Sequence, residues 1–241
     1  MSPTITLACV IPCYNAGGRV RSVAEAALRE TPQVWVVDDG CTDGSAAALA
    51  DLPLRIVRHD RNLGKGHAIL TGLRAALADP AINAVVLLDA DGQHDAAAIP
   101  TFAARLTETG AAMVIGGRVF DGSHVPLRSR VGNTVTALVT RFLLGENLPD
   151  TQCGYRMLSR SFAETVIQRV GGGRYETEME MIVLAIRGGY PLATTPIRTV
   201  YEEGNASSHF RKVSDSFRIY ARLLRAMARH APGAARQLRS R

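Results

Sequence analysis

The stretch "LLDADGQHD" (residues 87–95) joins an aliphatic run to three carboxylates, a glutamine and a histidine. The apolar half, extended upstream by "AVV", is typical of a strand that is buried on both faces. The acidic half carries more negative charge than a turn needs. Asp89 and Asp91 are spaced so that their carboxylates could share one hard cation, with the amide oxygen of Gln93 as a further ligand. The alternative is a plain turn before a helix, for which Asp95 is the expected cap.

The pattern around this stretch predicts an α/β fold. Short apolar runs without polar alternation are each followed by an alanine-rich helical segment, which indicates a mainly parallel sheet covered by helices on both faces. We expect strands at 5–12, 33–39, 54–59, 84–90 and 111–117, and helices at 19–30, 64–79 and 95–109. A further helix, capped by Asp43 or Ser45, is expected after the second strand.

The second half is less regular. We expect helices near 131–144, 160–169 and 175–189, the last ending at Gly188 or Gly189, and a strand within 193–203. Neither a repeat nor a low-complexity linker divides the chain. We therefore expect one main domain over residues 1–207, followed by a basic amphipathic helix and tail over residues 208–241.

Charge is concentrated in that tail. The 241 residues carry a net charge of +6, yet nine basic residues and one acidic residue lie from Asn205 onward. Apolar residues recur there at helical spacing. Two interpretations remain open: a terminal helix packed on the core, or a helix lying on an anionic membrane surface. In the second, Arg211 and Lys212 could bind a lipid phosphate.

Cysteine usage and hydropathy bear on location. The four cysteines form no CxxC pair, which favours a reducing compartment. No signal peptide is evident, and no segment approaches the roughly 20 apolar residues of a spanning helix. We expect a cytoplasmic protein, or one held peripherally on the cytoplasmic face of the membrane.

Polar clusters follow three of the expected strands: "PCYNAGG", "DDGCTDGS" and "DADGQHD". Because ligands of open α/β sheets bind beyond the carboxyl ends of the strands, we expect these clusters to converge on one crevice. Asp38 or Asp39 could bind a base edge or a ribose hydroxyl, and Gly40 is expected at positive φ. Lys65, in "RNLGKGHA", could neutralise a phosphate; the alternative is a solvent-exposed surface lysine.

Five segments together resemble family 2 glycosyltransferases. "VIPCYNAGG", "VVDDGCTDGS", "NLGKGHAILTGL", "LLDADGQHD" and "DTQCGYRML" follow in the order and spacing of that family. The resemblance covers about residues 5–220 and is strongest to the branch of dolichyl- or polyprenyl-phosphate mannose and glucose synthases. It implies a GT-A fold with a Rossmann-like sheet, and a nucleotide-sugar as donor.

The resemblance also implies roles for single residues. Those of the nucleotide-sugar site are Pro12, Tyr14, Asn15, Asp38, Asp39, Lys65 and Asp89, while Asp89, Asp91 and Gln93 would hold Mg²⁺ or Mn²⁺. The family often has an acid after the asparagine of its first motif, whereas Ala16 follows Asn15 here. The choice between UDP and GDP therefore stays open.

For the reaction we expect a single displacement with inversion at the anomeric carbon. A hydroxyl acceptor would need a base, for which Asp150 is the candidate; an anionic lipid phosphate would need none, and Asp150 would then position a substrate or serve as a helix cap. The long loop over 116–133 could bind acceptor phosphate through Arg118, Arg128 and Arg130. Glu178 matches an acid of the family's acceptor region, while Glu176 and Glu180 are expected to be exposed.

Two other functions are weighed. A sugar nucleotidyltransferase would also need a metal and basic residues, but "CYNAGGRV" lacks the glycine-rich basic signature expected after its first strand. A nucleic-acid or partner-binding module would explain the basic tail but not the three polar clusters. We therefore expect a glycosyltransferase with a nucleotide-sugar donor, a lipid-phosphate or glycan acceptor, and no nucleic-acid partner.

Overall fold

A computed structural model describes residues 5–118, 153–173 and 176–197. Within them, seven strands form one sheet in the order β3-β2-β1-β4-β6-β5-β7. The strands are β1 (Leu7–Cys13), β2 (Val34–Asp38), β3 (Arg55–Arg58), β4 (Ala84–Leu87), β5 (Met113–Arg118), β6 (Arg156–Ser159) and β7 (Leu192–Ile197). All pairs are parallel except those of β6, which runs antiparallel to both β4 and β5. The mainly parallel sheet expected from the sequence is confirmed.

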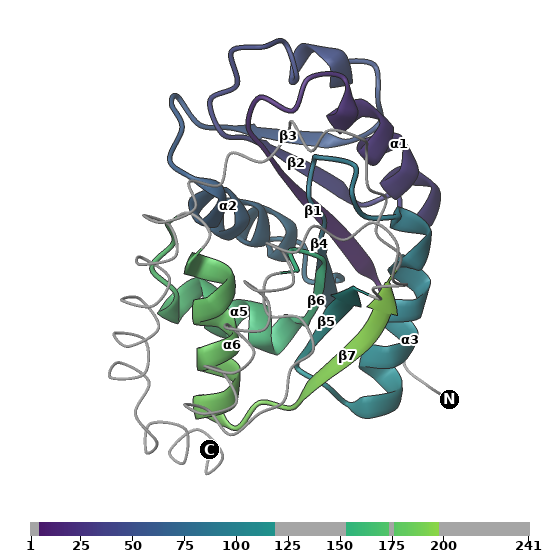
Figure 1. Cartoon of the computed structure of the whole chain (residues 1–241), viewed down its shortest axis with the longest axis vertical. Coiled ribbons are helices and arrows are strands. Elements are labelled where there is room, and N and C mark those ends of the chain that lie inside the picture. Colours follow the sequence, from purple (N-terminus) through teal and green to yellow (C-terminus); the bar gives the residue numbers. More distant parts are fainter. Residues whose placement is uncertain (1–4, 119–152, 174–175, 198–241) are drawn as a thin grey trace, which may run out of the picture.

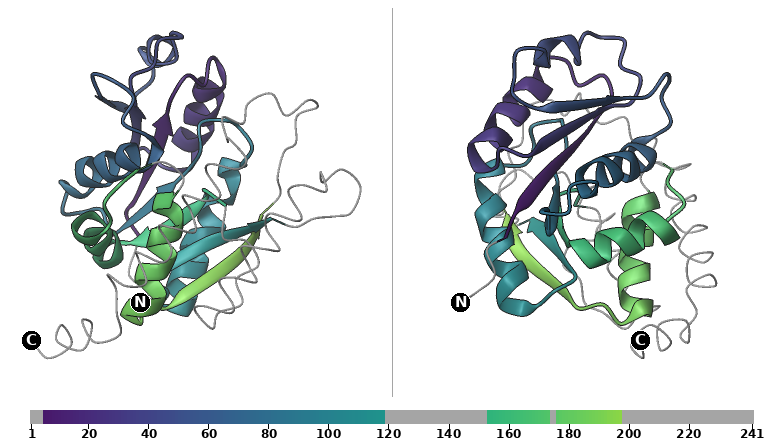
Figure 2. Two further views of the ribbon diagram at one scale, coloured as in Figure 1. Left: turned by 60° about the vertical axis from the view of Figure 1, so that its left-hand side comes forward. Right: turned by 180° about the vertical axis from the view of Figure 1, so that it is seen from behind.

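Helices cover both faces of this sheet (Figure 1). They are α1 (Arg19–Glu30), α2 (Lys65–Leu77), α3 (Ile99–Thr109), α5 (Arg160–Arg169) and α6 (Glu176–Gly188). Helices α1 and α3 lie on one side, whereas α2, α5 and α6 form a layer on the other, as the view from behind in Figure 2 also shows. The central strands β2 and β4 are buried along their whole length because helices cover both of their faces.

The helix ends mostly follow the expected signals. Asp95 caps the short 3₁₀ helix η2 (Ala96–Ala98) that leads into α3, accepting a hydrogen bond from the Ala97 N–H at 3.0 Å. Gly110 ends α3 in the left-handed conformation (φ 61°), and Gly189 (φ 67°) follows α6. Both positions favour glycine because a Cβ is strained there.

The prediction of a helix after β2 is wrong. That segment contains only a three-residue 3₁₀ helix, η1 (Ala47–Leu49). Asp43 and Ser45 do not cap a helix of the expected length, because both accept hydrogen bonds from the Gly17 N–H of the loop that follows β1. Pro53 lies only eight residues beyond Ser45, so little chain remains for a stable helix.

Several expectations lie outside the described residues. These are the helix near 131–144, the end of the strand expected within 193–203, the boundary between residues 207 and 208, and the basic tail helix. In the part of the chain that the structure describes, none of the helices is both long and apolar enough to cross a membrane.

Candidate active site

The aspartate pair lies where β4 ends. The Leu88 N–H donates to the carbonyl of Val10 and so carries the pairing of β4 with β1 one residue further. A turn follows, in which Gly92 has a φ of +78°. The Asp91 carboxylate accepts a hydrogen bond from the Gln93 N–H at 3.0 Å. The chain therefore leaves the sheet with Asp89, Asp91 and Gln93 in one tight, self-bonded turn.

Lys65 is the immediate partner of this turn. Its Nζ lies 2.6 Å from Asp89 Oδ1 and 2.8 Å from Glu178 Oε1. The Lys65 and Asp89 side chains are about one-fifth exposed, and that of Glu178 is 7% exposed. The first residue of α2 thus joins the end of β4 to α6, and Lys65 is not the solvent-exposed lysine of the alternative interpretation.

Close backbone contacts fix this group of charges. A Cβ on Gly154 would collide with the Asp89 carboxylate, and a Cβ on Gly66 would collide with the Thr177 hydroxyl. The Gly66 N–H also donates to the carbonyl of Gly173 at 2.8 Å. Because α2 and the start of α6 approach so closely, Lys65 can reach Glu178.

The charges determine the protonation of the two aspartates. Burial acts to raise the pKa of the Asp89 carboxyl, but the Lys65 ammonium, helped by His94 and Arg156, outweighs it and holds that pKa below its usual value. The pKa of Asp91 is raised, first by burial and then by the negative charge of Asp89. The Asp89 and Asp91 carboxylates are therefore close enough that the ionisation of one disfavours the ionisation of the other.

Arg156 is a residue that sequence reasoning missed. It is fully buried in β6, and its guanidinium donates to the carbonyls of Cys153 (2.9 Å) and Glu178. The available signal was an arginine within the apolar run "GYRML". Glu180, expected to be exposed, is 2% exposed; it faces the interior because α6 is buried from Thr177 through Val183. The side chain of Glu176 lies outside the part of the chain that the structure describes.

Asp39 faces inward. Its Oδ1 accepts from the His59 ring (2.7 Å) and the Leu63 N–H (2.9 Å), and its Oδ2 accepts from the Gly64 N–H (2.9 Å). It is 2% exposed, so in this structure its carboxylate holds the loop that leads to Lys65.

The neighbouring Asp38 is 8% exposed and accepts from the Cys41 N–H at 2.8 Å. Gly40 has the expected positive φ (74°), and a Cβ there would meet the Arg61 backbone at 2.6 Å. This close approach joins the loop after β2 to the loop between β3 and α2.

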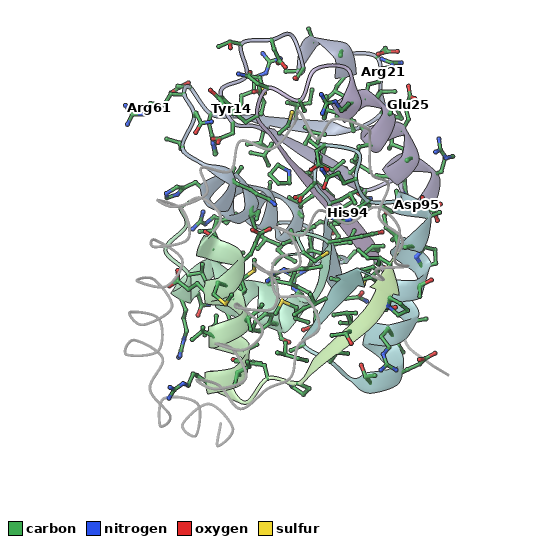
Figure 3. The ribbon with its side chains drawn as sticks, in the orientation of Figure 1. Tyr14, Arg21, Glu25, Arg61, His94 and Asp95 are labelled. Atoms are coloured by element: carbon green, nitrogen blue, oxygen red, sulfur yellow. The ribbon has the colours of Figure 1, made fainter. Side chains whose placement is uncertain are left out.

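The loop after β1 is tied to the loop after β2. Asn15 has a φ of +49°, and its Oδ1 accepts from the Thr42 N–H at 2.9 Å. The thiols of Cys13 and Cys41 lie 3.8 Å apart. Pro12 is buried in β1, whereas Tyr14 is 43% exposed at the end of the same strand. Figure 3 marks Tyr14 in this loop, Arg61 in the loop before α2, and His94 beyond β4.

A chain of contacts joins the three polar clusters. The loop after β1 bonds to the loop after β2, whose Asp39 holds the residues before Lys65, and Lys65 contacts Asp89 after β4. Arg118 is the last residue of β5. The other candidates lie outside the described residues: Asp150, Arg128, Arg130, Arg211 and Lys212.

The donor set fits a divalent cation only in part. The structure brings the Asp89 and Asp91 carboxylates together in the turn that also contains Gln93, and the repulsion between the two carboxylates would be relieved by positive charge. Among the described residues, however, no three His, Cys, Asp or Glu side chains are grouped so that they alone could hold a metal. In general, Mg²⁺ is held by one or two carboxylates together with water and substrate phosphates.

Comparison with known proteins identifies the class. The model of "Glycosyl transferase family 2" matches residues 8–167. A UDP-N-acetylglucosamine–dolichyl-phosphate N-acetylglucosaminyltransferase of Methanococcus voltae is 26% identical over 89% of this chain and 93% of its own. A polyprenol monophosphomannose synthase of Mycolicibacterium smegmatis is 30% identical over 81% of this chain and 77% of its own.

A solved structure supports the fold. Glucosyl-3-phosphoglycerate synthase of Mycobacterium tuberculosis, crystallised with Mn²⁺, UDP and glucosyl-3-phosphoglycerate, superposes with a TM-score of 0.70 at 16% identity, covering 95% of this chain and 82% of that one. The fold is therefore the GT-A fold of glycosyltransferases. The chain belongs to glycosyl transferase family 2, and its named relatives support the branch that acts on polyprenyl phosphates.

Proposed function

We propose that this glycosyltransferase moves a sugar from a UDP- or GDP-linked donor to a polyprenyl phosphate, or to another lipid or glycan acceptor, with Mg²⁺ or Mn²⁺ and with inversion. The observation that carries the proposal is the turn after β4, in which Asp89 and Asp91 stand together beside the Lys65 ammonium. Its family membership favours glycosyl transfer over nucleotidyl transfer and over a purely binding role.

The residues divide the task by their chemistry. Asp89, Asp91 and Gln93 would hold the divalent cation, which when bound would stabilise the negative charge that grows on the β-phosphate of the leaving nucleotide. Tyr14 and Asn15, at the end of β1, and Asp38, at the end of β2, would contact the nucleoside, because ligands of such sheets bind beyond the carboxyl ends of the strands. Asp39 positions the backbone before Lys65 through the hydrogen bonds to Leu63 and Gly64.

The acceptor proposal rests on the relatives. Two of them are named for transfer to dolichyl phosphate or a polyprenol. A phosphate acceptor is already anionic at neutral pH and needs no base, so Asp150 would position substrate. For a hydroxyl acceptor, Asp150 would serve as the base. We further propose that the basic tail and the Arg118, Arg128 and Arg130 loop bind acceptor phosphate, with the tail lying on an anionic membrane surface.

The test offers UDP- and GDP-sugars with and without Mn²⁺, and then a polyprenyl phosphate with the donor that binds most tightly. We expect a sugar-linked polyprenyl phosphate as product, formed only when the metal is present. Asp91→Ala should abolish turnover while leaving the far-UV circular dichroism unchanged. Normal turnover by that variant would refute the metal assignment.

A truncation tests the tail separately. Deleting the residues after Ser207 should lower turnover with lipid acceptors more than it lowers the affinity for the donor, and should lower binding to anionic vesicles. An equal loss of donor affinity would indicate that the tail serves folding instead.

A further inference from the structure

We infer that Lys65 is an internal competitor of the metal ion for Asp89, so that the divalent cation binds well only when a diphosphate arrives with it. This inference rests on the proposed function and deepens it, because it assigns an order and a coupling to donor and metal binding. The ion pair at 2.6 Å between Lys65 Nζ and Asp89 Oδ1 carries it.

The Lys65 ammonium stands between two carboxylates. Its Nζ lies at ion-pair distance from both, 2.6 Å from Asp89 Oδ1 and 2.8 Å from Glu178 Oε1. A dication that takes Asp89 Oδ1 must replace this ammonium or lie beside it. Two cations at hydrogen-bond distance of one carboxylate oxygen repel each other strongly in a site that is only about one-fifth exposed.

Lys65 keeps one anionic partner when it releases Asp89. Its other anionic partner, Glu178, is 7% exposed and lies 2.8 Å from Nζ. Lys65 can therefore release Asp89 and still keep Glu178 as a partner, but its ammonium is then paired with one carboxylate instead of two. A diphosphate at the start of α2 supplies that missing negative charge, since a lysine at a helix N-terminus readily contacts phosphate.

The proposed metal ligands all come from the turn after β4. In the described part of the chain, this turn offers the metal two carboxylates and an amide, without a third acidic, histidine or cysteine side chain grouped with them. A diphosphate thus completes the metal site and removes the competitor in one event. By linkage, the factor by which the nucleotide tightens metal binding equals the factor by which the metal tightens nucleotide binding.

The decisive experiment measures Mn²⁺ binding to the folded protein without nucleotide, using the electron paramagnetic resonance signal of free Mn²⁺. Lys65→Met should bind Mn²⁺ alone at least about ten-fold more tightly than wild type, because Asp89 is then unpaired. Lys65→Arg, which keeps the competing charge, should bind Mn²⁺ as weakly as wild type.

A matched control separates local competition from general charge. Arg58→Met removes an equal charge from a side chain that is 66% exposed and 3.6 Å from Asp38. Solvent screens such a charge, so its removal should change Mn²⁺ affinity by less than about two-fold. An equal gain in the Lys65→Met and Arg58→Met variants would overturn the inference.

The wild-type protein provides a measurement that depends on no variant. UDP and GDP are added separately, and the one that binds should tighten Mn²⁺ binding at least about ten-fold. Equal Mn²⁺ affinity with and without the nucleotide that binds would overturn the inference. Its failure is distinguishable from that of the proposed function. If sugar transfer occurs but Lys65→Met leaves Mn²⁺ affinity unchanged, the competition alone is refuted. If Mn²⁺ affinity rises as expected but no sugar is transferred, the competition stands.

Discussion

The Asp39 carboxylate accepts a hydrogen bond from the His59 ring at 2.7 Å, although the two residues lie on different strand ends. The other ring nitrogen, Nε2, lies 3.0 Å from the Thr71 hydroxyl of α2, within hydrogen-bond distance. With the Leu63 and Gly64 N–H groups on the same carboxylate, this contact holds the β3–α2 loop in place. The position of Lys65, at the start of α2, therefore depends on Asp39.

Asp39→Asn should destabilise the protein by about 3 kcal/mol, because an amide cannot accept all three hydrogen bonds and leaves buried donors unpaired. The free energy of unfolding in urea measures this. Asp38→Asn is the matched control: its carboxylate accepts the Cys41 N–H and lies at 3.6 Å from Arg58, so the loss should be nearer 1 kcal/mol. Equal losses would show that Asp39 has no special structural role.

Gly154→Ala should lower turnover by at least about 100-fold, because the added Cβ displaces the Asp89 carboxylate and small misplacements at a reacting centre are costly. Steady-state kinetics checks this. Gly18→Ala serves as the control, since φ there is −67° and, within the described part of the chain, no atom beyond the neighbouring residues lies within 4 Å of the added Cβ; its turnover should match that of wild type. Full activity of Gly154→Ala would mean that Asp89 need not hold its present position.

Arg160→Ala should cost about 2 kcal/mol of unfolding free energy, measured by urea denaturation. The guanidinium donates to three carbonyls, those of Leu77, Asp79 and Ile82, and so closes the end of α2 against β4. Glu164→Gln removes only the half-exposed ion pair with Arg160 at 2.8 Å and should cost less than about 0.5 kcal/mol. A larger effect of Glu164→Gln than of Arg160→Ala would contradict this assignment.

Diamide, a thiol oxidant, should join Cys13 and Cys41 and leave Cys9 and Cys153 reduced, as peptide mapping without reductant would show. The first two thiols lie 3.8 Å apart and need to approach only to about 2 Å. Cys41 is partly exposed, so diamide reaches it first and the neighbouring Cys13, although buried, completes the disulfide; Cys9 and Cys153 are buried, at 0% and 1% exposure. Alanine at Cys41 should abolish the cross-link; a disulfide that includes Cys9 or Cys153 would refute the prediction.

The same thiols should show a distinct pH dependence. Burial raises the pKa of Cys13 and of Cys41 above the usual value. At neutral pH both are therefore protonated more completely than a free cysteine, and only the thiolate is nucleophilic. Alkylation by iodoacetamide should be slower than for free cysteine at pH 7 and rise steadily through pH 9. A rate that levels off just above pH 9, as expected for an ordinary thiol with a pKa of about 8.5, would show that these pKa values are not raised.

The order of elements and the position of the aspartate pair could be predicted from local sequence patterns. Apolar runs followed by amphipathic helices specify strands such as β4 and helices such as α2, and the acids that follow a buried strand fall at the carboxyl edge of the sheet. The segment after β2 was misjudged because the hydrogen bonds of Asp43 to Gly17 come from another loop, which local propensity does not register.

Sequence alone therefore determined the α/β architecture, the family and the turn that holds Asp89, Asp91 and Gln93, because these depend on short-range periodicity and motif order. Tertiary structure decided which charges meet. Lys65 contacts Glu178, which lies 113 residues further along the chain. Arg156 donates to the carbonyl of Glu178, and the buried Asp39 carboxylate accepts from the Gly64 N–H. Such pairs depend on how helices pack across a sheet, and residues far apart along the chain carry no local signal of their contact.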